Sequence, residues 1–118
     1  MSLPFETSHG LSSFVVSPGA WIMHKGLTFT KRKNLTKRYK DLYEVWYVST
    51  QLGDFSTDAV DELSFLKKQH PKWFKTFSKN LKEWLNNASP IDWNYLESQD
   101  LQGKLTRMNF KQIIETLL

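Results

Sequence analysis

The sequence predicts a mainly α-helical protein in which five or six short helices surround an aromatic-rich core, with one short strand near the N-terminus. Three observations lead to this fold class. Apolar residues recur at helical spacing in successive segments. Prolines and small polar residues stand where these segments begin. Aromatic residues make up 14% of the 118 residues, and many lie on the apolar faces, so they are expected to build the core.

The N-terminal part is expected to differ from the rest. Residues 1–12 are mostly polar, and we expect a flexible N-terminus there, followed by a single helical domain over residues 13–118. Residues 13–16 form a short β-type run that predicts the strand. Because a lone short strand is not stable in water, it needs a partner, and pairing between two copies would give a homodimer.

The first two predicted helices flank a basic segment. Ser17 is a favourable N-cap and Pro18 suits the first helical position, so a helix is expected from Pro18 to about Phe29. The second helix, which we call the central helix, should end near Leu52, with Gly53 as the residue that follows it. Its expected apolar stripe consists of Tyr39, Leu42, Tyr43, Trp46 and Tyr47.

Two further helices meet at Pro71. The third should open at the capping residues of segment 56–58 and run to Gln69. The fourth, from Pro71 to about Asn87, has the clearest amphipathic pattern. Its predicted apolar face holds Trp73, Phe74, Phe77, Leu81, Trp84 and Leu85. Its other face carries Lys72, Lys75, Lys79 and Lys82.

The chain is expected to end in two short helices. The fifth starts at Pro90, and Gly103 separates it from a terminal helix. The apolar face of that terminal helix consists of Phe110, Ile113, Ile114 and Leu117.

Composition excludes several classes of protein. The absence of cysteine excludes disulfides and thiolate metal sites and suits a cytoplasmic protein. No apolar run approaches the roughly 20 residues of a membrane span, and no secretory signal is visible, so we expect no membrane partner. The three histidines lack metal-ligand spacing, and no residue pattern predicts a metal site or a catalytic group.

A basic run precedes the central helix. It places six cations within ten residues: Lys31, Arg32, Lys33, Lys37, Arg38 and Lys40. Cations at a helix N-terminus oppose the helix dipole, so a partner that carries phosphates is the expected recipient. The spacing of Lys37 and Arg38 to Asp41 also predicts ion pairs within the helix.

Part of this run resembles a family signature. The residues Arg38-x-Lys40-Asp41-Leu42-Tyr43-Glu44 resemble the R-x-K-D-x-Y-D motif of the AbiEii-like nucleotidyltransferases, the toxins of type IV toxin–antitoxin systems. Segment 18–25, which ends in Lys25, resembles the preceding motif of that family. Glu44 stands where the family usually has aspartate.

The resemblance implies the C-terminal half of such an enzyme, because the chain lacks a D-x-D pair and a Gly-Ser or Gly-Gly turn. Lys25 would then approach a phosphate, while Arg38, Lys40 and Asp41 would orient substrate or brace the site. The isolated chain would have no catalytic residue and no cofactor. Mg²⁺ and a nucleoside triphosphate would bind only with a separate catalytic N-terminal half.

An alternative hypothesis is a small, non-enzymatic nucleic-acid-binding module. RNA would then bind through Lys31, Arg32, Lys33 and Lys37 together with Lys72, Lys75, Lys79 and Lys82. The aromatics of the fourth helix are expected to point into the core, away from bases. A simpler interpretation of its lysines is the solvated face of a packed helix. A third hypothesis is an interaction protein with no site of its own.

Overall fold

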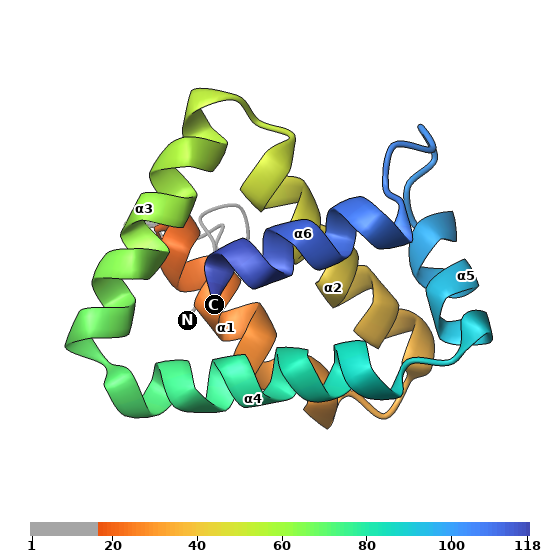
Figure 1. Ribbon diagram of the computed structural model, residues 1–118, viewed down its shortest axis with the longest axis horizontal. Helices are drawn as coiled ribbons and strands as arrows, with labels where there is room; N and C mark the ends of the chain where they lie inside the picture. Colours follow the sequence, from red (N-terminus) through yellow and green to blue (C-terminus); the bar gives the residue numbers. More distant parts are fainter. Residues whose placement is uncertain (1–16) are drawn as a thin grey trace, which may run out of the picture.

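Six α-helices and one 3₁₀ helix make up the computed structural model over residues 17–118, the part of the chain that it describes (Figure 1). The α-helices are α1 Pro18–Thr28, α2 Leu35–Thr50, α3 Asp54–Gln69, α4 Pro71–Asn87, α5 Pro90–Ser98 and α6 Arg107–Leu117, with the 3₁₀ helix η3 at Phe29–Lys31. The prediction of a mainly helical fold is confirmed. The predicted flexible segment 1–12 and the strand at 13–16 lie outside the described residues.

Helix α1 occupies the middle of the arrangement and packs against α2, α3 and α4 (Figure 1). Two of its glycines allow close approach. A Cβ atom on Gly26 would overlap the Phe77 ring of α4, and one on Gly19 would lie 2.7 Å from the Glu62 Cβ of α3. The Gly19 amide also donates a hydrogen bond of 2.7 Å to Glu62 Oε1. The small residues of α1 therefore set its distance from two neighbouring helices.

The core is rich in aromatic residues, as the sequence predicts. Trp84, Trp93 and Phe110 form an edge-to-face trio with ring centroids 4.9 to 5.8 Å apart, which joins α4, α5 and α6. Phe29 and Phe77 are fully buried beside α1. The apolar face predicted for the terminal helix is also present in α6, because Phe110, Ile114 and Leu117 are buried.

Local capping explains several helix starts. The Asn34 side chain accepts a hydrogen bond from the Lys37 amide at the start of α2. Ser89 and Asp92 form a capping box at the start of α5, and Thr106 and Asn109 form another at the start of α6. Each of these helices begins with its own polar cap.

The connection between α2 and α3 corrects two predictions. Helix α2 ends at Thr50, and Gly53, which was expected to close it, instead precedes α3 with a φ of 61°. Helix α3 starts at Asp54, before the predicted start in segment 56–58. The Ser56 hydroxyl is buried and accepts a hydrogen bond of 2.8 Å from the Leu52 amide. The positive φ of glycine reverses the chain so tightly that the next helix begins immediately.

Two aromatic residues that were predicted to lie on buried apolar faces are exposed to solvent. Tyr47 of α2 is 40% exposed, and Trp73 of α4 is 55% exposed. Trp73 stacks on His70 with a centroid distance of 4.0 Å and an interplanar angle of 15°. Both residues lie at the edges of their apolar stripes, where the extent of burial depends on how far the neighbouring helices reach.

Candidate functional site

Asp41, a predicted substrate-orienting residue, lies in the interior rather than on a helix flank. It is 2% exposed and faces α1 and the segment after η3. Its Oδ1 accepts a hydrogen bond of 3.1 Å from Lys25 Nζ, and its Oδ2 accepts one of 3.0 Å from Arg32 Nε. This carboxylate therefore ties α1 and the basic connection to α2.

The charge of Lys25 is balanced by two carboxylates. Its Nζ lies 3.1 Å from Asp41 and 3.4 Å from Glu44, and it stands 5.2 Å from the centre of the Trp21 ring. The side chain is only 16% exposed. An incoming phosphate would have to compete with both carboxylates for this ammonium group.

The predicted pairing of Lys37 and Arg38 with Asp41 is wrong. Arg38 Nε instead donates a hydrogen bond of 2.6 Å to the Arg32 carbonyl, and Lys37 is exposed. The reason is that Asp41 lies on the face of α2 that α1 covers, so it meets cations from other segments. Arg38 and Arg32 together hold the connection between η3 and α2 in place.

The charges around Asp41, Lys25 and Arg32 form a cluster in which the pKa values of Arg32 and of the neighbouring His24 are shifted. The hydrogen bond and the charge of Asp41 raise the pKa of Arg32 above its usual value. Burial, with nearby positive charge that includes Lys25, lowers the pKa of His24, which favours the neutral imidazole. The cluster is therefore built around one buried carboxylate and its two cations.

The predicted nucleotide-site residues are thus brought together only in part. Lys25 and Asp41 are in contact, Arg38 reaches them through Arg32, and Lys40 points away as an exposed residue. Helical spacing along α2 alone gave no signal for the contact between Arg32 and Asp41. Such a contact depends on the path of the chain between two helices.

The remaining cations of the basic run are exposed. Lys31 and Lys33 lie on either side of Arg32, and Lys37 is on the first turns of α2. Among these predicted nucleic-acid-binding residues, Arg32 differs because its guanidinium is engaged by Asp41. The others keep their charges at the surface.

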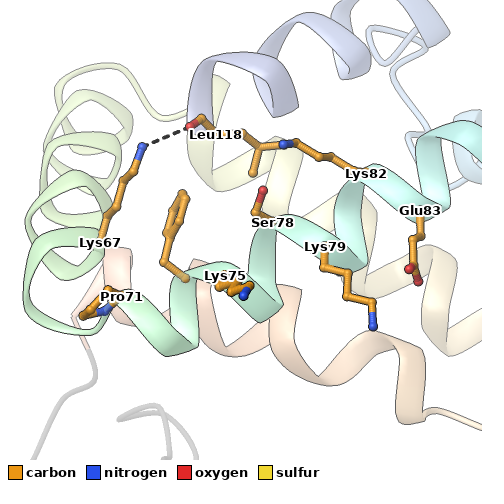
Figure 2. Close-up of a pocket in the computed structure, with 9 residues that line it drawn as sticks. Lys67, Pro71, Lys75, Ser78, Lys79, Lys82, Glu83 and Leu118 are labelled. Atoms are coloured by element: carbon orange, nitrogen blue, oxygen red, sulfur yellow. Dashed lines mark hydrogen bonds between the residues drawn. The ribbon is translucent and has the colours of Figure 1, made fainter.

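A second candidate region is an open groove over α4, with a volume of about 620 Å³ (Figure 2). Lys75, Lys79 and Lys82 of α4 and Lys67 of α3 contribute their side chains to it. Figure 2 shows Ser78 and Lys82 on the side of α4 toward α6, whereas Lys79 and Glu83 extend toward the opposite side. We call this surface the lysine groove.

The charged side chains that line the lysine groove are mostly basic. Lys67 donates a hydrogen bond of 3.1 Å to the Leu118 backbone oxygen and lies 4.9 Å from the centre of the Phe74 ring (Figure 2). Lys75, Lys79 and Lys82 are exposed, and within residues 17–118 they form no ion pair. Lys72 is also exposed on α4 but lies outside the groove lining. Glu83 is the one acidic side chain among the lining residues of the groove.

Two classes of site receive no support from the described residues. Over residues 17–118, no group of three His, Asp or Glu residues is placed so that it could hold a metal ion. In the same part of the chain, no helix is both long and apolar enough to cross a membrane.

Over residues 17–118 the protein is a helical domain with a basic connection that Asp41 braces and a lysine-lined groove on its surface. No known family model, curated protein or solved structure matches this chain.

Proposed function

We propose that this protein is a small helical module that binds the phosphate backbone of nucleic acid through the lysine groove. The observation that carries the proposal is the set of exposed groove lysines, Lys75, Lys79 and Lys82, which have no acidic partner within residues 17–118. The braced cluster around Asp41 offers a less accessible alternative, because its charges neutralise one another.

The spacing of the lysines fits a polyanion better than a single small anion. With a rise of about 1.5 Å per residue, the groove lysines from Lys75 to Lys82 extend over about 10 Å of α4. Flexible lysine side chains act as point charges that neutralise phosphates without reading base edges. The groove is accordingly expected to bind many sequences with similar affinity.

Salt dependence tests this proposal directly. Binding of a fluorescein-labelled RNA should weaken steeply as salt rises, because neutralised phosphates release their counterions. Replacing Lys75, Lys79 and Lys82 together by glutamine should reduce the slope of log affinity against log salt by about 2, at roughly 0.7 per lost contact on a single strand. A matched control is Lys111→Gln, an exposed lysine on α6.

The salt dependence of RNA binding should differ clearly between the two variants. Lys111→Gln should retain nearly the full slope, while the triple variant should bind weakly at every salt concentration. A flat salt response of the unmodified protein, or equal slopes for the two variants, would contradict the proposal.

A second proposal is that the chain acts as the helical half of an AbiEii-like nucleotidyltransferase. It is supported by the contact of 3.1 Å between Lys25 and Asp41, since the two motifs of the resemblance each contribute one of these residues. Such a protein would need a separate half that supplies the acidic residues for Mg²⁺. Nucleotide transfer by the two halves together should decrease in Lys25→Ala, measured beside a stability control. Unchanged nucleotide transfer in the Lys25→Ala variant would contradict the proposal that the chain is half of a nucleotidyltransferase.

A further inference from the structure

An exposed aromatic ring, Trp73, lies next to Lys72 on α4. Trp73 is 55% exposed, although the sequence pattern places it on the apolar face of the helix. The His70 ring stacks on one side of it, with a centroid distance of 4.0 Å. A tryptophan held by a parallel ring on one side has a preset orientation. Its opposite face is the one that a further flat ring can reach.

Next to Trp73 is a recess of about 190 Å³ between α1, α3 and α4. Its lining is almost wholly apolar and consists of Ala20, Met23, His24, Leu27, Leu66 and Trp73. This volume is below the roughly 300–1,000 Å³ of sites for drug-sized ligands, so the recess suits a single flat ring. Because it presents almost no hydrogen-bonding surface, it would not distinguish one base from another.

Helical spacing relates Trp73 to the lysines. Trp73 and Asn80 are seven residues apart and so lie on one side of α4. Asn80 Nδ2 donates to the Gly26 carbonyl at 3.0 Å, which shows that this side faces α1. Lys72 and Lys79 each precede one of these two residues, about 100° around the helix. The ring therefore borders Lys72 and Lys79, whereas Lys75 and Lys82 lie about 160° to 180° away on the opposite side of α4.

We infer that the protein binds a single strand, with one base stacked on Trp73 in the recess and the adjoining phosphates on Lys72 and Lys79 of α4. A positively charged track combined with a stacking aromatic is the arrangement by which proteins hold single strands without sequence preference. In a duplex the bases are already stacked on one another and do not reach such a ring. This inference rests on the proposed function and adds the type of nucleic acid.

The test uses a labelled oligouridylate, with an RNA hairpin duplex as competitor, at low salt. Trp73→Ala should weaken binding of the single strand about 5- to 150-fold, the range for losing one stacked base. The salt slope should stay unchanged, because no cation is lost. Trp73→Phe should retain most of the affinity, since a ring remains. Tyr47→Ala, an exposed aromatic on α2, is the matched control and should bind normally.

Two failures are distinguishable. If the oligouridylate shows no salt-dependent binding to the unmodified protein, the proposed function itself fails. If it binds with a steep salt dependence, but Trp73→Ala matches the unmodified protein and the duplex competes equally well, backbone binding stands and the single-strand inference is overturned. Circular dichroism of each variant establishes that the helices are intact, and Trp73→Phe provides the test if the alanine variant is unfolded.

Discussion

The hydroxyl of Tyr39 donates a hydrogen bond of 2.6 Å to Asp92 Oδ1, which joins α2 to the capping box of α5. The other carboxylate oxygen of Asp92 accepts a hydrogen bond of 2.9 Å from the Ser89 amide. Tyr39 itself is buried, and its ring stacks on Tyr95 of α5 at 5.6 Å. A single acidic side chain thus serves both a local cap and a long-range contact.

Tyr39→Phe should lower the free energy of unfolding by about 1–2 kcal/mol near neutral pH, because a partly buried hydrogen bond to a charged group is lost while the ring remains. Urea denaturation followed by circular dichroism measures this difference. Tyr95→Phe is the control, since the described contact of its side chain is made by the ring and not by the hydroxyl. Equal losses in the two variants would show that the Tyr39 hydroxyl has no special role.

The effect of Tyr39→Phe should depend on pH. The hydrogen bond from Tyr39 and those from Ser89 lower the pKa of Asp92 below 3.8, so the folded state binds fewer protons and this stabilisation is lost as the pH falls below that value. Burial and the contact with Asp92 raise the pKa of Tyr39 from 10.0 to about 12, so its stabilisation is lost as the pH rises through that interval. The stability difference between the two proteins should be largest between these limits. A constant difference from about pH 3 to pH 11 would contradict this reasoning.

Asp41→Asn should destabilise the protein by about 1–3 kcal/mol, because it leaves the partly buried Lys25 and Arg32 without their shared carboxylate. Glu44 remains near Lys25, which limits the loss. Thermal denaturation measures the change, and Lys40→Ala, an exposed residue of the same helix, is the control. If both variants unfold at the same temperature as the unmodified protein, Asp41 does not brace the fold, and a role in binding substrate becomes the better explanation for its burial.

Gly26→Ala should lower the free energy of unfolding by about 1–3 kcal/mol, because the added methyl group would overlap the buried Phe77 ring. Alanine is intrinsically the better helix former, so a simple propensity effect would have the opposite sign. Chemical denaturation decides between the two. Thr57→Ala, at an exposed position of α3, provides a substitution to alanine without an overlap. A stabilised Gly26→Ala protein would mean that α1 and α4 are not held as closely as described.

The sequence by itself determined where three of the six described α-helices begin, because those signals are local. Pro18, Pro71 and Pro90 each stand at the start of an α-helix, as predicted. The lysines of α4 are exposed for a related reason, since the side of a strongly amphipathic helix that carries charges stays in water. The exposure of the groove lysines therefore follows from the helical periodicity of the sequence alone.

Only the tertiary structure decided the partners of residues at the borders of those faces. Asp41 is buried because α1 and the segment after η3 bring Lys25 and Arg32 to it, and nothing in the spacing along α2 encodes that meeting. Trp73 stays exposed because its neighbours leave a recess beside it instead of covering it. Helical periodicity fixes the angle of a side chain around its own axis, whereas the burial of that side chain depends on other helices distant in sequence.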